Sequence, residues 1–542
     1  ANVLGFVGID NEGLSGLEYL YNDSIKGRKT KVNLLFDAKR HSYSSDAGLE
    51  SSDGNTVVLN LDRPIQYIVE QVLKDVVSST EATDGNAVVM DPHTGEILAM
   101  ASYPSFNPNR YSDFAVTTHR NRAILDIYEP GSTFKLITFS GVLNEGLGNT
   151  SEPIDCRVGT LRIAGKTYRE AKRSYGVLSF NEVLAKSSNV GTIKLGLRLG
   201  EEKLYNYVKL FGFGQQTGVD LPGEQQGLLR PSSQWSRISI GAISIGQEVG
   251  VTTLQMSRAV CAIANGGYLV TPRMVRRILT PDGDMIYESS PERARVLEAE
   301  TTHKMKEALE LVVTDGTGRG AQLGGYTSAG KTGTAQKFID GKYSDSKYIA
   351  SYAGFAPLEN PVLAAVIVIN EPKNQYYGGQ VAAPAFKQLM ERSLIHLSVP
   401  RDAESPLETT STQHSWEELA TSDGVSVKEE ELPLESLEET ILTLMEKETS
   451  SPESHQKITV KTNTFTLPDF SSLSLREVAH ACARLGLRLK VVGSGVAVGQ
   501  RPPANSQVSR ETVCEVFFSN RLNHVPSKAA LRSGPNTQPR VP

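Results

Sequence analysis

The spacing of apolar residues predicts an amphipathic helix that begins near residue 62. Asp62 is a typical capping residue, and Pro64 follows it in the first turn, where a missing backbone N–H is tolerated. The apolar residues behind them recur at helical spacing: Ile65, Ile68, Val69, Val72 and Val76. The segment is therefore expected to form a helix with one apolar face.

Two apolar runs follow, NAVVMD and EILAMAS, and the turn residues 92–95 join them, so a β-hairpin is predicted. Helical patterns then dominate to about residue 320. Strand patterns return at residues 348–357 and 362–369, and a last helix is expected near residues 383–397. Strands at both ends of a segment with helices between them are typical of an α+β domain whose sheet is completed by its later strands.

The composition changes at both ends of this domain, which we assign to residues 56–400. Residues 1–55 are Gly-rich and polar. Residues 401–460 crowd glutamates among Ser, Thr and Pro, which predicts a solvated, disordered acidic linker. The last residues, 520–542, contain Pro and scattered Arg and Lys, and they are expected to form a disordered tail.

A second, small domain is predicted at residues 461–519. It contains an amphipathic helix near residues 475–485, which Gly486 ends. Strands are expected at residues 487–492 and 512–518. The pattern predicts one helix packed on a three-stranded sheet.

Composition narrows the range of functions. With 542 residues, of which 39% are hydrophobic, the chain can bury substantial cores in two to four domains. The net charge of -5 argues against a nucleic-acid partner, because phosphate binding needs clustered Lys and Arg. The apolar run at residues 362–369 is much shorter than the roughly 20 residues that cross a bilayer. The chain begins at Ala1 without a signal peptide, so a membrane anchor upstream of it is an open expectation.

No metal and no cofactor are predicted. The cysteines lack the close pairing of a zinc site and the density of a disulfide framework, so buried free thiols are expected. The four cysteines are Cys156, Cys261, Cys482 and Cys514. The histidines His93, His119 and His303 lack ligand spacing and are interpreted as turn or surface residues.

The stretch YEPGSTFKLITF contains the first candidate for chemistry. Pro130 and Gly131 stand immediately before an apolar-periodic segment, so Ser132 is expected at a helix N-terminus. Backbone N–H groups and the helix dipole stabilise an anion there, and Lys135 lies three residues further on the same helical face. Lys135 can act on the Ser132 hydroxyl only after losing its own proton, which burial and a nearby second cation would both favour.

The S-x-x-K spacing alone is weak evidence for catalysis. It recurs at Ser328, Ser344 and Ser454, and the ordinary interpretation of one copy is a surface serine and a solvated lysine. S-x-N likewise recurs at Ser105 and Ser179, where a capping or turn serine is expected. A lone Lys-Thr-Gly is ordinarily a strand that ends in a turn. Only a combination of these motifs is informative.

The combination is present, in order. After Ser132 and Lys135, a second motif lies in the helical segment NEVLAKSSNVGTIKLGLRLG and a third in a strand-like run. Their residues are Ser187, Ser188 and Asn189 in the second, and Lys331, Thr332, Gly333 and Thr334 in the third. This trio is the known signature of penicillin-binding proteins and class A β-lactamases.

The chain resembles the class B penicillin-binding proteins, the serine D,D-transpeptidases that cross-link peptidoglycan. The resemblance is nearly continuous over residues 56–397, through NRA with EPGSTFK, LAKSSNVG, SIGQEVGVTTLQMSRAVCAIANGG, VVTDGTGRGA, AGKTGTAQ, YIASYAGFAP and YGGQVAAPAF. GIDNEGLSGLEYLYN resembles the end of that family's pedestal domain, so residues 1–55 are expected to be its remnant. Residues 461–519 resemble a PASTA module. The implied fold is the penicillin-binding transpeptidase or serine β-lactamase-like fold, an antiparallel sheet flanked by helices.

The resemblance implies a role for each motif residue. Ser132 would be the nucleophile that forms an acyl-enzyme, and Lys135 the general base that takes its proton. Ser187 would relay protons to the leaving D-alanine, and Asn189 would bind the donor peptide backbone. Lys331 would supply positive charge to the cleft.

Further roles concern the binding of the donor peptide. Gly333 would leave room for the donor to lie against the strand as an added β-strand, while the Thr332 and Thr334 hydroxyls hold its terminal carboxylate. The backbone N–H groups of Ser132 and Thr334 would form the oxyanion hole.

The resemblance also implies substrates, partners and a location. Stem peptides that end in D-Ala-D-Ala would be the substrates, and penicillins and other β-lactams would be covalent inhibitors. A membrane-anchored protein with its catalytic domain in the periplasm or extracytoplasmic space is expected. No glycosyltransferase domain precedes the transpeptidase, so a separate glycan polymerase is expected as a partner. YIASYAGFAP and the PASTA module favour a division-type enzyme in septal synthesis, with division proteins as partners.

Two departures and two alternatives stay open. Tyr175 with Gly176 stands where family members often have His-Gly, and Glu248 follows Gln247 where they often have Gly, which leaves fine substrate preference open.

A D,D-carboxypeptidase or β-lactamase of the same fold would release the acyl group to water, although no convincing E-x-x-L-N lies between the second and third motifs. A penicillin sensor would share the acylated serine without catalysis. The PASTA module is as compatible with a spacer as with cell-wall binding.

Overall fold

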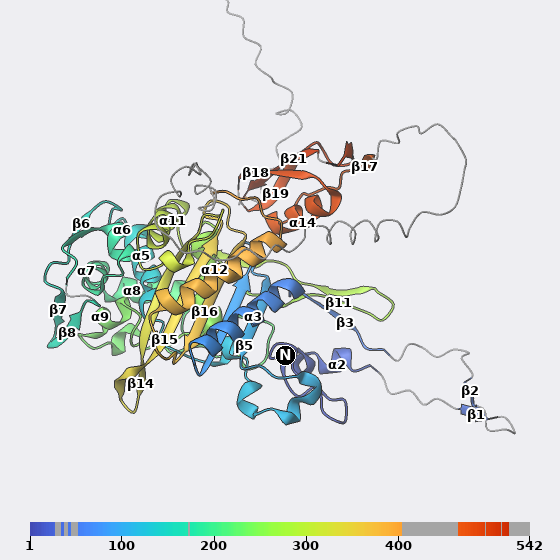
Figure 1. The fold of residues 1–542 in the computed structure, drawn as a ribbon, viewed down its shortest axis with the longest axis horizontal. Coiled ribbons are helices and arrows are strands. Elements are labelled where there is room, and N and C mark those ends of the chain that lie inside the picture. The colour runs from blue at the N-terminus through green and yellow to red at the C-terminus, as the bar shows by residue number, and fades with distance from the viewer. Residues whose placement is uncertain are drawn as a thin grey trace, which may run out of the picture.

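The computed structural model describes residues 1–27, 34–36, 42–44, 53–171, 174–403, 464–493, 495–510 and 512–519. The predicted tail at residues 520–542 lies outside this part of the chain, and so does the predicted acidic linker beyond residue 403. The described residues form a large domain and a small C-terminal domain (Figure 1).

Five strands form the antiparallel sheet of the large domain, in the order β14-β15-β16-β4-β5. β4 (Asp84–Met90) and β5 (Ile97–Tyr103) are the predicted hairpin, and β16 (Leu363–Asn370) pairs with β4. β15 (Lys342–Ala356) and β14 (Ala329–Ile339) follow outward, which leaves β14 at the edge. The later strands complete the sheet that the early hairpin begins, as the α+β pattern predicted.

Helices cover both faces of this sheet (Figure 1). α3 (Arg63–Ser79) and α12 (Gly378–His396) pack on one face, and α10 (Thr253–Ala264) packs on the other. Alternation along β4 separates the two cores, because Ala87 belongs to the core beneath α3 and α12 and Val88 to the larger core around α10. The sheet is therefore buried on both sides.

α3 forms where the capping signal predicted it. The Asp62 side chain accepts a 3.1 Å hydrogen bond from Ile65 N, and the predicted apolar face is buried apart from the half-buried Val76. α12 begins at Gly378, five residues before the predicted start at residue 383. A start at residue 383 would put Pro384 in the first turn, where proline is best tolerated, but the observed helix contains Pro384 in its interior.

The large domain contains further helices, 3-10 turns and small sheets. Its other helices are α1 (Gly16–Leu20), α2 (Asn22–Ile25), α4 (Arg122–Leu125), α5 (Lys135–Asn144), α6 (Phe180–Ala185), α7 (Asn189–Leu199), α8 (Glu201–Leu210), α9 (Ser239–Ser244) and α11 (Ala299–Thr314). The 3-10 turns are η1 (Pro108–Asp113), η2 (Val116–Thr118), η3 (Gly131–Phe134), η4 (Ser232–Gln234) and η5 (Arg319–Ala321). The small sheets contain β1 (Leu34–Phe36), β2 (Ser42–Ser44), β3 (Thr56–Leu59), β6 (Pro153–Asp155), β7 (Thr160–Ile163), β8 (Lys166–Arg169), β9 (Val177–Ser179), β10 (Tyr268–Val270), β11 (Val275–Leu279), β12 (Met285–Glu288) and β13 (Arg293–Arg295).

The C-terminal domain has the predicted helix and three-stranded sheet. The helix is α14 (Leu475–Leu485), and the sheet has the order β18-β21-β19. A two-stranded sheet, β17-β20, accompanies it. The strands are β17 (Thr464–Thr466), β18 (Arg488–Gly493), β19 (Val496–Arg501), β20 (Gln507–Ser509) and β21 (Val513–Ser519). Phe470, Val478 and Val516 lie in a core that belongs to this domain.

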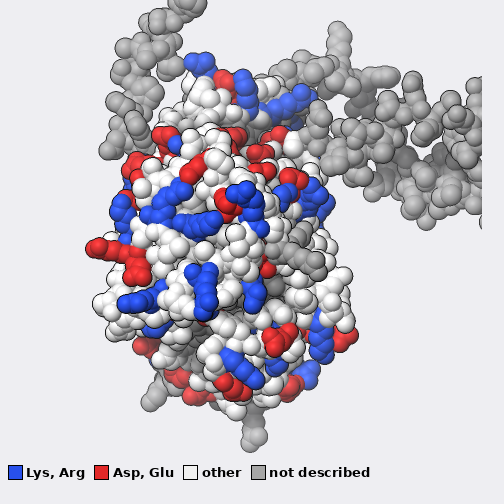
Figure 2. Space-filling model, turned by 90° about the vertical axis from the view of Figure 1, so that its left-hand side faces the viewer, with Lys and Arg blue, Asp and Glu red and all other residues white. Residues whose placement is uncertain are grey.

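All four cysteines are buried free thiols, as the sequence predicted. Within the described ranges, no helix combines the length and the apolar character that a membrane crossing requires. Figure 2 shows basic and acidic side chains on the same face of the molecule, in keeping with the net charge of -5.

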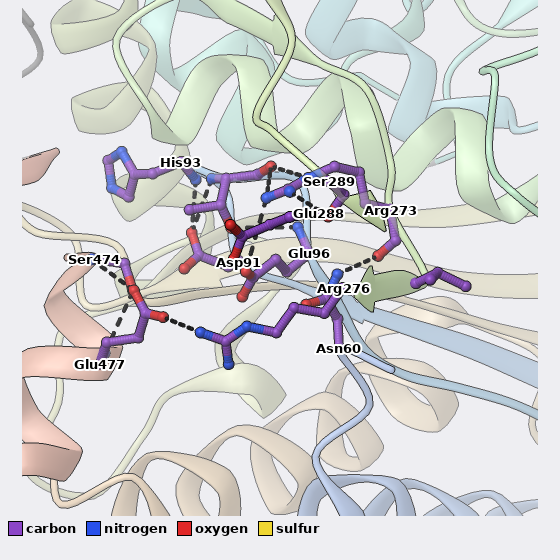
Figure 3. Close-up of polar contacts among 12 residues, drawn as sticks. Asn60, Asp91, His93, Glu96, Arg273, Arg276, Glu288, Ser289, Ser474 and Glu477 are labelled. Carbon is purple, nitrogen blue, oxygen red and sulfur yellow. Dashed lines mark hydrogen bonds and ion pairs between the residues drawn. The ribbon is translucent and has the colours of Figure 1, made fainter. Parts of the chain in front are cut away.

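The start of α14 contacts the large domain (Figure 3). Glu477 forms a 3.1 Å ion pair with Arg276 of β11. The same carboxylate accepts hydrogen bonds from Ser474 N at 3.0 Å and Ser474 Oγ at 3.2 Å, so it also caps α14. Leu475 packs against the cores of both domains. One carboxylate therefore supports both the helix start and the domain contact.

Replacing Glu477 with alanine is expected to destabilise the start of α14 by about 1 kcal/mol, the usual effect of losing a capping interaction. Hydrogen exchange of the amides of α14 measures this effect, and exchange should be faster in the variant. Glu515→Ala is the matched control, because Glu515 lies in strand β21 and forms a 2.8 Å ion pair with Lys490. Equal protection of α14 in the two variants would contradict the capping role.

Candidate active site

Ser132 lies on the 3-10 turn η3, which runs directly into α5. Gly131 N donates a 3.0 Å hydrogen bond to Gly246 O, which holds the turn against the segment after α9. Ser132 is half-buried, so solvent can reach the residue. The predicted position at a helix start is confirmed, and a tight 3-10 turn forms the entry to the α-helix.

Lys135 is completely buried and lies one turn after Ser132. Its Nζ donates hydrogen bonds to Ser187 O at 2.7 Å, to Ser187 Oγ at 3.2 Å and to Asn189 Oδ1 at 2.8 Å. If the amine loses a proton, the contact with Ser187 Oγ can reverse its direction, because a hydroxyl can also donate. These contacts bring the first two motifs together.

The second motif lies at a break between two helices, not within one helix as the sequence pattern predicted. α6 ends at Ala185 and α7 begins at Asn189. Ser187 between them has a φ of 59°, a left-handed conformation that is uncommon outside glycine. The periodicity could not show this break, because both helices place apolar residues at helical spacing in the same core. The break is what lets the carbonyl and hydroxyl of Ser187 both reach Lys135.

Lys331 and Gly333 share one face of β14, and Gly333 packs against η3. Lys331 is completely buried, and its Nζ donates a 3.0 Å hydrogen bond to Thr332 O. A Cβ at Gly333 would lie 2.2 Å from Ser351 Oγ and 3.0 Å from Thr133 Cγ2. Glycine is therefore required for the edge strand to approach the serine turn, a packing reason beyond the donor space that the sequence suggested.

Thr332 and Thr334 lie on the opposite face of β14. Thr334 is half-buried, and its Oγ1 accepts a 2.9 Å hydrogen bond from Gly378 N, which leaves its hydroxyl hydrogen for a ligand. Thr332 is buried, and its hydroxyl lies 2.7 Å from Thr317 Oγ1. Thr334 is therefore the more accessible of the two predicted carboxylate contacts.

The two buried lysines share one electrostatic environment. Burial lowers the pKa of Lys135 to about 7, while the negative charge of Glu170 acts in the opposite direction. Burial also lowers the pKa of Lys331 well below its usual range, and the positive charge of Lys135 adds to this effect. The sequence argument named burial and a second cation as causes for Lys135. Burial does act on Lys135, but the effect of the second cation is seen at Lys331.

Two polar neighbours of the motifs were not predicted. The Glu170 carboxylate accepts hydrogen bonds from Asn189 N at 2.7 Å and Val190 N at 3.2 Å. No spacing in the sequence marks it, because it lies in the polar stretch KTYREAKR, 17 residues before Ser187. Thr317 contacts the third motif, and its stretch VVTDGTGRGA was among the segments that carried the resemblance. The family resemblance therefore marked the segment that contains Thr317, whereas nothing in the sequence marked Glu170.

The profile of the penicillin binding protein transpeptidase domain matches residues 85–391, a range that contains all three motifs. The chain belongs to this family. The large domain therefore has the penicillin-binding transpeptidase fold with α+β content, as the resemblance implied.

The relatives of this chain include proteins named for sporulation, for peptidoglycan transpeptidation and for penicillin binding. Stage V sporulation protein D of Bacillus subtilis is 40% identical over 406 residues, which cover 74% of this chain and 63% of that protein. Probable peptidoglycan D,D-transpeptidase PenA of Neisseria gonorrhoeae is 34% identical over 405 residues, which cover 74% of this chain and 67% of that protein. Penicillin binding protein 3 of Mycobacterium tuberculosis is similar in structure, with a TM-score of 0.68 and 34% identity over 75% of this chain and 90% of that chain. The chain thus spans less than two thirds of the first of these relatives.

Gly333→Ala is expected to slow labelling by a fluorescent penicillin by about 100-fold, the usual effect of displacing reactive groups by roughly 1 Å. The added methyl group would lie 3.0 Å from Thr133 Cγ2 of η3, so β14 and η3 would have to move apart, and 2.2 Å from its nearest neighbour, Ser351 Oγ of β15. The double variant Gly333→Ala with Ser351→Ala removes that neighbour and should recover part of the rate. Gly499→Ala is the control, since its nearest neighbour is 4.0 Å away. Unchanged labelling of Gly333→Ala would refute the packing argument.

Proposed function

We propose that this chain is a serine-type peptidoglycan D,D-transpeptidase, which cross-links stem peptides through an acyl-enzyme on Ser132. The observation that carries the proposal is the hydrogen-bonded contact of the Lys135 amine with Ser187 and Asn189, one turn after a serine that solvent can reach. Membership of the transpeptidase family and the names of the relatives support this reaction class. The proposed substrate is a stem peptide that ends in D-Ala-D-Ala.

In the proposed acylation, the neutral Lys135 amine takes the hydroxyl proton of Ser132 while Ser132 Oγ attacks the carbonyl carbon of the penultimate D-alanine. The carbonyl oxygen becomes an oxyanion, which the backbone N–H groups of Ser132 and Thr334 stabilise. The bond to the nitrogen of the last D-alanine then breaks. That nitrogen takes the hydroxyl proton of Ser187, and Ser187 takes in its place the proton that Lys135 gained, which leaves both groups neutral. Free D-alanine leaves, and the donor strand remains as an ester of Ser132.

In the proposed transfer, an amine of the acceptor strand attacks the ester carbonyl and forms a new amide bond. The acceptor nitrogen gives its proton to Lys135, and the Ser132 oxygen takes that proton from Lys135 as the ester bond breaks. The free hydroxyl and the neutral amine are restored. A D,D-carboxypeptidase or β-lactamase would use water in place of the acceptor amine, and a penicillin sensor would stop at the acyl-enzyme.

The third motif is proposed to bind the donor peptide, together with the Asn189 side chain. The donor lies along the edge strand β14 as an added strand, and its terminal carboxylate meets the Thr332 and Thr334 hydroxyls. Lys331 Nζ lies 3.4 Å from Thr332 Oγ1 and supplies positive charge beside them. Because burial lowers the pKa of Lys331, its charged form is less favoured than that of an exposed lysine. An adjacent anion raises a lysine pKa, so binding of the donor carboxylate would favour the charged form.

The first test is labelling with a fluorescent penicillin, followed by peptide mapping. The label is expected on the tryptic peptide that contains Ser132, and Ser132→Ala should lose it completely, because no other group forms the ester. Cross-linking of lipid II-derived strands is measured in parallel as dimeric muropeptides. Equal dimer formation by both proteins would exclude Ser132 as the nucleophile. Release of the penicilloyl group within seconds would favour a β-lactamase, and stable labelling without dimers would favour a sensor.

The rate of penicillin acylation is expected to rise with pH and to level off above about pH 7. The neutral form of Lys135 is the proposed base, and its pKa is lowered to about 7. Protonation of the amine below this pKa should reduce the rate to about one hundredth of the plateau at pH 5. The measurement is the second-order labelling rate between pH 5 and 8. A flat profile over this range would remove Lys135 as the base.

The setting of the reaction is also a proposal. The resemblance favours a division-type enzyme that acts in septal synthesis. The protein would be anchored in the membrane with its catalytic domain outside the cytoplasm. A separate glycan polymerase and division proteins would be its partners. The C-terminal domain is proposed to be a PASTA module, supported by its single helix on a three-stranded sheet. The C-terminal domain contacts the large domain through the Glu477–Arg276 ion pair and through Leu475. These contacts favour a docked spacer domain over a freely tethered domain that binds the cell wall.

A further inference from the structure

The Glu170 carboxylate is buried at the start of α7. Glu170 follows β8 directly, and the backbone N–H of Glu170 donates a 3.0 Å hydrogen bond to Gly159 O. Its side chain accepts hydrogen bonds from Ser188 Oγ, Asn189 N and Val190 N. A buried carboxylate with three donors around it is well compensated as an anion. Glu170 therefore fixes the start of α7 relative to the β7-β8 hairpin.

This carboxylate determines the position of the second motif. Ser188 Oγ donates to Glu170 and accepts a 2.9 Å hydrogen bond from Gly191 N, so the helix cap itself is oriented by Glu170. The N–H of Asn189 is held by the same carboxylate, while its side-chain Oδ1 accepts from Lys135 Nζ. An anion at a helix N-terminus also interacts favourably with the helix dipole. Glu170 thus fixes the backbone of the segment that contains the hydrogen-bond partners of Lys135.

Glu170 also affects Lys135 through its charge. Its negative charge raises the pKa of Lys135 and so opposes the larger effect of burial. Among the described residues, the titratable groups that interact with Glu170 or Lys135 include Lys331 on β14, Cys156 after β6 and Tyr175 before β9. Because the site is buried, the interaction is weakly screened by water and salt.

We propose that Glu170 is a positioning residue for the Lys135 base: its buried carboxylate holds the turn at Ser187 and the start of α7 against the amine, and it supplies an anionic charge to that amine. The inference rests on the proposed function, in which neutral Lys135 takes the proton of Ser132. The hydrogen bonds of the Glu170 side chain go to Ser188, Asn189 and Val190, so its effect on Lys135 is transmitted through these residues and the electrostatic field.

Glu170→Gln tests this proposal in the full chain. The amide keeps the shape of the carboxylate but loses the charge and one acceptor oxygen. The plateau rate of penicillin acylation is expected to fall by about 10- to 100-fold, the range for losing a hydrogen bond to a charged group. The rise of the rate with pH is expected to move to lower pH, because without the anion Lys135 gives up its proton more readily. A merely structural loss would lower the rate at every pH and leave the position of the rise unchanged.

Glu170→Asp separates charge from geometry. It keeps the anion and shortens its reach, so the rise should stay near its wild-type pH while the plateau falls. This variant also keeps the test decisive if Glu170→Gln does not fold.

Glu224→Gln is the matched control. Glu170 and Glu224 are both 8% exposed, and the Glu224 carboxylate accepts a 2.8 Å hydrogen bond from Thr217 N, outside the three motifs. A loss of folding stability is expected in this variant, measured by thermal unfolding, with no shift in the pH profile of acylation.

The outcomes distinguish this inference from the proposed function. A wild-type protein without a rise of rate near pH 7 would remove Lys135 as the base, whatever Glu170 does. A wild-type rise whose position Glu170→Gln leaves unchanged would overturn the inference alone, whether or not the plateau falls.

Discussion

The burial of the Lys135 amine is the constraint on which the rest of the site depends. A charged amine loses strong hydration when it is buried, so a completely buried lysine requires close polar partners. All three hydrogen-bond partners of Lys135 belong to the turn between α6 and α7 and the first residue of α7. They are in reach only because Ser187 adopts a left-handed conformation. The base, the turn and the helix start therefore act as one unit, and none of them can be placed independently.

The site separates buried amines from accessible oxygen and amide groups. Lys135 and Lys331 are completely buried, whereas Ser132, Ser187 and Asn189 are half-buried. Protein atoms thus lower the proton affinity of the amines, while the groups that meet a ligand stay within reach of it. This arrangement needs a strand close to the serine turn, and the missing side chain at residue 333 permits that approach.

The sequence predicted the large features of the fold and supplied the residues of the candidate site, but it did not predict the local geometry that joins them. The cap at Asp62, the hairpin and the strand that contains Lys331 follow from patterns that short segments carry by themselves. The break at Ser187 does not, because a left-handed serine between two apolar-periodic helices leaves no mark in the periodicity. Glu170 was also missed, because its partners are brought to it by the tertiary fold and not by spacing. Patterns along the chain identified the motifs, and long-range contacts decided how they meet.

Glu170 and Glu477 show that a carboxylate at a helix start has different consequences in buried and in exposed surroundings. Each carboxylate supports a helix start and also acts on a cation, Lys135 in one case and Arg276 in the other. The Arg276 pair is partly exposed, with side chains 42% and 24% accessible, and such surface pairs usually contribute no more than about 1 kcal/mol. Glu170 is buried beside a buried amine, where water screens the interaction far less. A capping carboxylate at the surface therefore contributes a modest contact between domains, whereas a buried one can set the protonation of a neighbouring base.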